Sequence, residues 1–415
     1  MAAVAAIIGA GQAGFQVAAS LREEGFDGRI MLIGDEPVLP YQRPPLSKSY
    51  LAGETGVDDL WLRPSEFYAK HQIDLVYSDT VTEIHRADRR LRLASGSEIA
   101  WDHLVLATGA RYRPLAVPGA ELDGVLPLRT LADAGTLRRR LDEAREIVVI
   151  GAGFIGLEFA SVAIARGADV HIIEITLQPM GRVVSAQTSQ FFTDAHIRWG
   201  AKVSLGTGVT RIFGANGRVT GVETTDGRRL PAELVLVCIG VIPNAELVAD
   251  AGLGVDNGIV VDEYLATGDP SIFAIGDCAN FPTPYASGRI RLESVQNAVD
   301  QGRCVAAHIA GRPERYQKVP WFWSDQGCLK LQIAGITVGH DKAVIRGRPA
   351  DGHFSIFCFR GERLIGVESV NRPADHVVAR RLLAGDPALS PEQADDENYD
   401  LRAHARKLGT SPRAQ

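Results

Sequence analysis

The stretch VAAIIGAGQAGFQVAASLREEGFDGRIMLIGDE, residues 4–36, contains the pattern that decides the fold. A short apolar run leads into three glycines in a GxGxxG spacing, Gly9, Gly11 and Gly14. A helical pattern follows, and a second apolar run at 30–33 ends just before Asp35. Such glycines allow a tight turn and close approach of a pyrophosphate, and a carboxylate about 20 residues later binds a ribose. The stretch predicts a Rossmann-like unit that binds a dinucleotide, although a single glycine turn of this kind can be coincidental.

The same pattern recurs in EIVVIGAGFIGLEFASVAIARGADVHIIE, residues 146–174. This copy carries Gly151, Gly153 and Gly156, and its second strand ends on Glu174. Two such folds predict two dinucleotides, and the alternative is a duplication with one inactive site. A carboxylate at Glu174 pairs with a free 2′-hydroxyl and repels a 2′-phosphate, and the nearest arginine, Arg182, lies eight residues further on. The second copy therefore favours NADH over NADPH.

The composition of the 415 residues is that of a globular chain of two or three domains. A net charge of −6 argues against general nucleic-acid binding. The five cysteines lie at least 24 residues apart, which disfavours a zinc or iron–sulfur site and indicates buried thiols in a reducing compartment. We expect no metal site, no membrane span and no signal peptide, and hence a cytoplasmic protein.

Two further stretches complete a known pattern. HLVLATGAR, residues 103–111, and DPSIFAIGDCA, residues 269–279, are strands that end in short polar turns. With the two glycine patterns they resemble the two-dinucleotide flavoprotein superfamily that includes glutathione reductase. PYQRPPLSKSYL, LRTLADA, IGVIPNAEL and PWFWSDQ make the finer resemblance, which is to the putidaredoxin reductase type of NADH-dependent ferredoxin reductase. This resemblance covers roughly residues 4–400.

The resemblance implies an α/β fold with two Rossmann-like dinucleotide-binding domains, as in glutathione reductase, and a C-terminal α+β domain. The implied segments are an FAD-binding domain at 1–112 and 245–318, an NADH-binding domain at 113–244, a C-terminal domain at 319–402 and a disordered tail at 403–415.

The resemblance also assigns residues to FAD and NADH. The implied FAD residues are Gly9, Gly11, Ala13, Gly14, Asp35, Arg43, Lys48, Val81, Ala107, Thr108, Gly109, Arg129, Gly276, Asp277, Val295 and Trp323. The implied NADH residues are Gly151, Gly153, Phe154, Ile155, Gly156, Glu158, Glu174 and Gly240. Asp277 would bind the ribitol of FAD, and Val295 would begin a helix whose N-terminus points at the flavin, unless Val295 is only a core residue.

Lys48 and Glu158 are the implied catalytic residues, as an ion pair beside the flavin. The alternative is that Glu158 only starts a helix while Lys48 is solvated. Phe154 is either a gate over the flavin or a packed core aromatic. Gly240 would let the nicotinamide lie close to the backbone.

Residues 43–48 contain no cysteine where thiol-dependent members of the superfamily need one. Electrons would therefore leave FAD singly, for a [2Fe–2S] ferredoxin on a separate chain that serves a cytochrome P450 or a Rieske oxygenase. Arg303 is either part of the ferredoxin-docking surface or a solvated side chain. A rubredoxin or nitrite-reductase-associated flavoprotein and an NADH-responsive sensor or scaffold remain alternatives. We expect a monomer or weak dimer.

Overall fold

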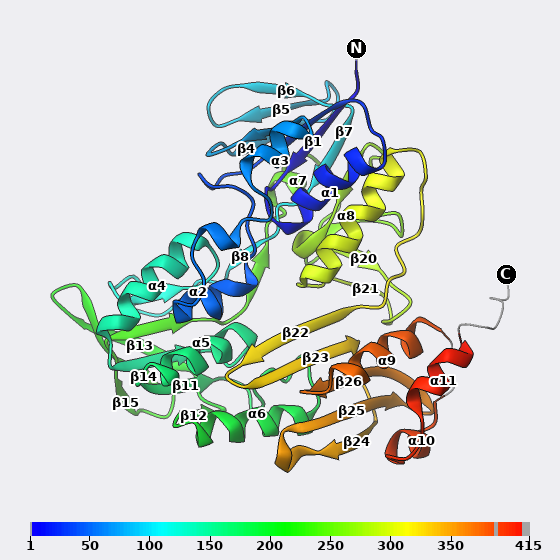
Figure 1. Cartoon of the computed structure of the whole chain (residues 1–415). Coiled ribbons are helices and arrows are strands. Elements are labelled where there is room, and N and C mark those ends of the chain that lie inside the picture. The colour runs from blue at the N-terminus through cyan, green and yellow to red at the C-terminus, as the bar shows by residue number, and fades with distance from the viewer. Residues whose placement is uncertain (1, 386–388, 409–415) are drawn as a thin grey trace. The chain divides into compact units, whose positions relative to one another are not determined.

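The computed structural model describes residues 2–385 and 389–408 of the chain (Figure 1). It divides into two compact units. The first comprises residues 1–42, 57–111 and 241–318, and the second comprises residues 43–56, 112–240 and 319–415. Each unit is described by itself.

The first unit is built on a parallel sheet with the strand order β19-β7-β1-β2-β3. Its strands are β1 (Val4–Ile8), β2 (Arg29–Ile33), β3 (Ile73–Val76), β7 (His103–Leu106) and β19 (Ile272–Ala274). Its helices are α1 (Gln12–Glu23), α3 (Ser65–Lys70), α7 (Glu246–Asp250) and α8 (Val295–Ile309). The strands β1 and β7 are almost wholly buried because helices cover the parallel sheet, and α1 packs against α8.

Smaller sheets complete the first unit. The meander β4 (Val81–His85), β5 (Arg90–Leu93) and β6 (Glu98–Ala100) lies between β3 and β7 in the chain. The sheet β18-β20-β21 consists of β18 (Ile259–Val260), β20 (Ala279–Pro282) and β21 (Arg289–Ile290). Two 3-10 turns, Asp58–Leu60 and Gly276–Cys278, belong to this unit as well.

The second unit repeats this plan. Its parallel sheet has the order β12-β11-β10-β16-β9. The strands are β9 (Val125–Pro127), β10 (Glu146–Ile150), β11 (Asp169–Glu174), β12 (Lys202–Leu205) and β16 (Leu234–Val237). The helices are α2 (Ser49–Ala52), α4 (Leu131–Glu143), α5 (Phe154–Ala165) and α6 (Ala186–Arg198), with a 3-10 turn at Pro44–Ser47. A meander of β13 (Val209–Ala215), β14 (Arg218–Thr224) and β15 (Arg229–Pro231) lies between β12 and β16 in the chain.

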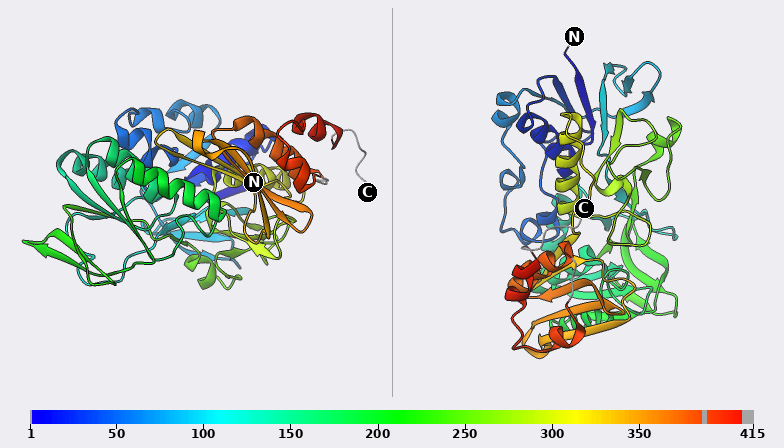
Figure 2. Two further views of the ribbon diagram at one scale, coloured as in Figure 1. Left: turned by 90° about the horizontal axis from the view of Figure 1, so that it is seen from below. Right: turned by 90° about the vertical axis from the view of Figure 1, so that its right-hand side faces the viewer.

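The second unit also contains an antiparallel sheet of order β22-β23-β26-β25-β24 (Figures 1 and 2). The strands are β22 (Trp321–Gln326), β23 (Leu329–Gly335), β24 (Lys342–Arg348), β25 (His353–Arg360) and β26 (Arg363–Val370), with a 3-10 turn at Pro349–Asp351. The helices are α9 (Pro373–Ala384), α10 (Pro391–Asp395) and α11 (Leu401–Leu408). Phe357, Phe359 and Leu382 belong to the core beneath α9, so this region is the expected sheet with helices.

The chain passes between the units through two short strands, β8 (Ala110–Tyr112) and β17 (Val241–Pro243), which form a two-stranded sheet. The predicted three-domain division stays a prediction, because contacts group residues 43–56 with the second unit and join the C-terminal sheet to it. The predicted disordered tail is wrong for residues 403–408, which continue α11. Within α11, the apolar residues Leu401 and Ala405 lie four positions apart and join the core. The rest of that tail, 409–415, lies outside the described residues.

Candidate functional site: two glycine turns and a buried carboxylate

The first glycine turn connects β1 to α1. Gly9 has a φ of +109°, and a Cβ there would overlap the carbonyl of Ala107. A Cβ on Gly14 would in turn overlap the carbonyl of Gly9. Gly11 differs, because its φ is an ordinary −83° and no described atom lies within 4 Å of the position of its Cβ. The fold itself requires the first and third glycines, and Gly11 leaves room at a helix N-terminus that no side chain caps.

The second turn, from β10 to α5, repeats each detail. A Cβ on Gly151 would overlap the carbonyl of Cys238, and a Cβ on Gly156 would overlap that of Gly151. Gly153 again has an ordinary φ, and the position of its Cβ is open within the described part of the chain. Backbone N–H groups at such a helix N-terminus bind phosphate oxygens. Both turns therefore fit the pyrophosphate of a dinucleotide.

Other predicted FAD residues gather around the first turn. Gly276 lies so near Ala13 that a Cβ on it would be 3.1 Å from the Ala13 Cβ. The N–H of Gly276 donates to Oε1 of Gln301 on α8 at 2.7 Å, which joins the Gly276-Asp277 turn to that helix. Thr108 Oγ1 donates to the carbonyl oxygen of Asn244 at 2.6 Å. The glycine turn, the ends of β7 and β19 and α8 thus meet in one region of the first unit.

The remaining predicted residues of the first unit have different surroundings. Asp35 is exposed, as expected of a carboxylate that binds a ribose. Val81 is a buried core residue, so only its backbone is left to contact a ligand. Val295 begins α8 as predicted, with Ser294 as the N-cap that accepts from the N–H of Asn297.

The other predicted FAD residues belong to the second unit, and the structure pairs some of them. Arg43 Nη1 donates to the carbonyl oxygen of Arg129 at 2.6 Å. Trp323, on β22, lies beside Trp321, with ring centroids 5.7 Å apart. Their contact with FAD stays a prediction.

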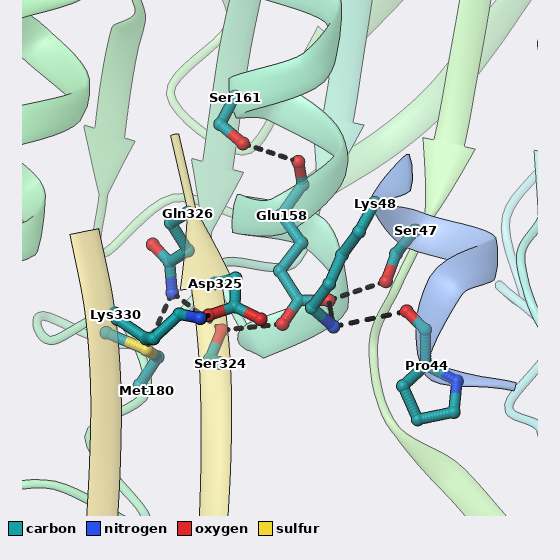
Figure 3. Close-up of polar contacts among 10 residues, drawn as sticks. All are labelled: Pro44, Ser47, Lys48, Glu158, Ser161, Met180, Ser324, Asp325, Gln326 and Lys330. Atoms are coloured by element: carbon teal, nitrogen blue, oxygen red, sulfur yellow. Dashed lines mark hydrogen bonds and ion pairs between the residues drawn. The ribbon is translucent and has the colours of Figure 1, made fainter. Parts of the chain in front are cut away.

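Glu158 is the centre of a polar cluster in the second unit (Figure 3). Its side chain is 4% exposed, and Lys48 Nζ donates to its Oε2 at 2.7 Å. Ser47 Oγ donates to the same oxygen at 2.5 Å, and Ser324 Oγ donates to Oε1 at 2.6 Å. The predicted ion pair is present, so Lys48 is paired rather than solvated, and the place of the pair beside the flavin stays a prediction. Both oxygens of the carboxylate are held by donors from the 3-10 turn 44–47, the residue after it, and β22.

A second group of side chains supports Ser324. Gln326 Nε2 donates to Ser324 Oγ at 3.2 Å and lies 3.6 Å from Met180 Sδ. Gln326 Oε1 lies 2.9 Å from Nε2 of His196, whose side chain is fully buried on α6. Burial lowers the pKa of His196, so the imidazole is neutral at neutral pH. A neutral His196 donates from Nε2 and fixes the orientation of the Gln326 amide.

Four polar residues of this cluster escaped the sequence analysis: Ser47, Gln326, His196 and Ser324. Ser47 lies between the predicted residues Arg43 and Lys48, in a segment where the sequence argument concerned these two residues and the absence of cysteine. Ser324 and Gln326 are two positions apart on β22, so their side chains lie on one face of the strand. This spacing was a signal that the sequence contained. His196 carried no such signal, because its partner Gln326 is 130 residues away in the chain.

The acid of the second copy is tied to its glycine turn. Glu174 Oε2 accepts from the N–H of Ala152 at 2.7 Å, and Oε1 accepts from the N–H and Oγ1 of Thr176 at 2.9 Å. The carboxylate is thus oriented beside the turn, where a ribose 2′-hydroxyl of a bound dinucleotide is expected.

Aromatic residues and a thiol complete the surroundings of α5. Phe154 is half-buried against Phe322, with ring centroids 4.5 Å apart, so it is packed in this structure and its role as a gate stays a prediction. Gly240 has a φ of +102°, which favours glycine. Burial and the charge of Glu158 raise the pKa of the Cys238 thiol to about 12, so Cys238 is not a thiolate at neutral pH.

These features define a flavoprotein oxidoreductase with two dinucleotide folds, and the comparisons with known proteins agree. Residues 4–302 match the pyridine nucleotide-disulphide oxidoreductase family, and residues 321–405 match the reductase C-terminal family. The chain belongs to the pyridine nucleotide-disulphide oxidoreductase family, in its putidaredoxin-reductase-like branch. The predicted fold class and the family resemblance are therefore confirmed.

Three relatives show how close the similarity is. Rhodocoxin reductase of Rhodococcus erythropolis is 52% identical over 95% of this chain and 93% of its own. The crystal structure of the ferredoxin reductase for the CYP199A2 system of Rhodopseudomonas palustris is 51% identical, with a TM-score of 0.95 over 97% of this chain and 99% of that chain. The putidaredoxin reductase in a covalent complex with putidaredoxin is 39% identical, with a TM-score of 0.95 over 99% of both chains.

FAD and NAD(P)H are the cofactors of this family. The open positions at Gly11 and Gly153 fit these two dinucleotides, since nothing in the described protein accounts for a glycine at either place. No helix among the described residues is both long and apolar enough to cross a membrane.

Proposed function

We propose that the chain is an NADH-dependent ferredoxin reductase. It would take electrons from NADH and pass them, through FAD, to a [2Fe–2S] ferredoxin that serves a cytochrome P450 or a Rieske oxygenase. The preference for NADH over NADPH rests on Glu174, whose oriented carboxylate would repel a 2′-phosphate.

The observation that carries this proposal is the chemistry of the segment against Glu158. Ser47 and Lys48 donate to that carboxylate from the segment where thiol-dependent members of the superfamily need cysteine. Cys238 lies near Glu158, and the raised pKa of its thiol makes it a poor nucleophile. A separate electron carrier is the acceptor that such a site supports.

Bound FAD supplies the redox chemistry, because it accepts two electrons as a hydride and can release them one at a time. The protein has to hold the dinucleotides and keep the charges beside them in place. In the second unit, the turn at Gly153 binds the nicotinamide dinucleotide, and Glu174 binds its ribose. The donors Lys48, Ser47 and Ser324 fix the Glu158 carboxylate.

Electron-acceptor specificity tests the proposal. The purified holoenzyme should reduce ferricyanide with NADH, and it should reduce cytochrome c only when a [2Fe–2S] ferredoxin is added. NADPH should be used at least about tenfold less efficiently, as expected for a repelled phosphate. If the enzyme reduced rubredoxin in preference to ferredoxin, rubredoxin would be the acceptor and the ferredoxin proposal would be wrong. Slow transfer to every carrier, with a long-lived NADH complex, would support a sensor instead.

Arg303 tests the docking surface. Its side chain is 63% exposed on α8, with Asp300 3.9 Å away. Arg303→Glu should raise the KM for an acidic ferredoxin severalfold, because charge complementarity increases the association rate. Ferricyanide reduction should stay at the wild-type rate. An equal loss in both assays would exclude a docking role. Arg312→Glu, on a guanidinium already paired with Glu24, is a matched control.

The assembly is a further part of the proposal. We propose a monomer or weak dimer, which light scattering after size exclusion would measure directly. A tight dimer at nanomolar concentration would contradict it.

A further inference from the structure

The loop 178–185, between β11 and α6, is attached to the second glycine turn. The N–H of Met180 donates to the carbonyl oxygen of Ala152 at 3.0 Å, and the N–H of the same Ala152 donates to Oε2 of Glu174. Arg182, exposed in this loop, lies 3.7 Å from the position of a Cβ on Gly240. The loop therefore borders the turn and the strand end that would receive the nicotinamide dinucleotide.

The conformation of this loop is not one that its own sequence favours. Met180 is a non-glycine residue with a φ of +53° and a side chain that is 6% exposed. Left-handed backbone is unfavourable for such a residue and persists where the surrounding structure imposes it.

Residues 321–405 hold the loop at three points. Gln326 Nε2 lies 3.6 Å from Met180 Sδ, as Figure 3 shows. Thr337 Oγ1, in the loop after β23, donates to the carbonyl oxygen of Val183 at 2.8 Å. Glu368, on β26, accepts the N–H of Ser185 at Oε1 and its Oγ–H at Oε2, each at 2.7 Å.

The contact of Glu368 is unusual in its burial. Glu368 and Ser185 are both fully buried, and Ser185 is the N-cap of α6. Two donors and a helix N-terminus stabilise the carboxylate. Burying the carboxylate costs desolvation energy, which the two hydrogen bonds from Ser185 offset. What the carboxylate adds is a fixed direction and register for the end of the loop.

We propose that Glu368 and Thr337 are positioning residues, and that the reductase C-terminal region holds the loop 178–185 in the shape that binds the nicotinamide dinucleotide. This inference rests on the proposed NADH-dependent function. It gives the C-terminal sheet a role in dinucleotide affinity.

The test uses the holoenzyme with Thr337→Val, Glu368→Gln and the double variant. Valine keeps the shape of Thr337 without its hydroxyl, and glutamine keeps one acceptor for the N–H of Ser185. Ser369→Ala is the matched control, because Ser369 is also fully buried on β26 but contacts Ser355 within the same sheet. ADP-ribose binding by calorimetry reports dinucleotide affinity without any redox step.

Each single variant should raise the dissociation constant of ADP-ribose and the KM for NADH about fivefold, the effect of one lost hydrogen bond. The double variant should raise both about twentyfold, with kcat for ferricyanide within about twofold of wild type. Trypsin should cleave after Arg182 faster in the double variant, and Ser369→Ala should match wild type throughout.

Unchanged ADP-ribose affinity in the folded variants, or a fall in kcat with KM constant, would overturn the inference. If the double variant does not fold, Thr337→Val alone decides between these outcomes. Failure of the wild-type enzyme to bind ADP-ribose or oxidise NADH would instead refute the proposed function on which the inference rests.

Discussion

The two glycine turns have the same backbone plan and different side-chain chemistry. Gly9 and Gly151 both pack against the carbonyl at the end of a neighbouring strand, and each is followed by an open middle glycine. Two positions after the third glycine, however, α1 carries Gln16 and α5 carries Glu158. Gln16 Nε2 donates to Ser20 Oγ on its own helix at 2.9 Å, whereas Glu158 collects donors from two distant segments.

The acids of the two copies differ in a similar way. Asp35 is exposed at its turn, while Glu174 is bound to Ala152 and Thr176. The two copies thus share a backbone that fits a dinucleotide, and a buried, charged network distinguishes the second copy.

Gly151→Ala should have the largest effect. Its Cβ would overlap the carbonyl of Cys238 at a φ of +102°, so we expect a loss of about 4 kcal/mol or more in the free energy of unfolding. Gly153→Ala should leave stability within about 0.5 kcal/mol and weaken ADP-ribose binding, because its Cβ enters the open cradle. Thermal unfolding and calorimetry measure both. Equal destabilisation by the two substitutions would contradict the assignment of Gly153 to the ligand.

Glu158→Ala should have the second-largest effect on stability. Removing the carboxylate leaves Lys48 without its buried partner, which we expect to cost about 3 kcal/mol. Gln16→Ala, at the equivalent position of α1, is the control and should cost about 1 kcal/mol or less. Denaturant unfolding of both variants gives the values. Similar losses in the free energy of unfolding for Glu158→Ala and Gln16→Ala would contradict the idea that a buried, charged network distinguishes the second copy.

Acid should weaken the second unit through His376. Burial, with a smaller contribution from Arg380, lowers the pKa of His376 from 6.5 to about 4. The unfolded chain binds the proton of His376 more tightly than the folded protein does. The free energy of unfolding is therefore highest above pH 6.5 and decreases as the pH falls toward about 4. The free energy of unfolding should be about 2 kcal/mol lower at pH 4.5 than at pH 7. Unfolding curves at the two pH values should show a smaller difference for His376→Phe. An unchanged pH slope in the variant would show that His376 titrates normally.

Glu174→Ala should have the smallest effect. We expect the KM for NADH to rise about tenfold and the preference over NADPH to fall by a similar factor, from one lost charged hydrogen bond. Stability should fall by only about 1 kcal/mol, because Thr176 can bond to water and only the N–H of the buried Ala152 loses its acceptor. Asp35→Ala is the partner variant, and it should lower FAD content without changing the ratio of NADH to NADPH use. A change in the ratio of NADH to NADPH use in Asp35→Ala would show that Asp35, and not Glu174, belongs to the nicotinamide dinucleotide site.

Much of the fold follows from local patterns. The apolar run, three glycines, helix and acid lie within about 35 residues of one another in each copy, so their spacing predicts β1-α1-β2 and β10-α5-β11 directly. The helix from Val295 was predicted at the residue where it begins. The tail was misjudged because the apolar face of α11 is short and its charged residues are numerous.

Local sequence patterns were enough to establish the two dinucleotide folds, the acids after them and the missing thiol in residues 43–48, because each of these depends on residues close together in the chain. The Lys48–Glu158 pair came from the family resemblance. Only the tertiary structure revealed Ser324 against Glu158 and Glu368 against Ser185, pairs separated by 166 and 183 residues. No periodicity reports such pairs, because a side chain's partner at that distance depends on how sheets and helices pack.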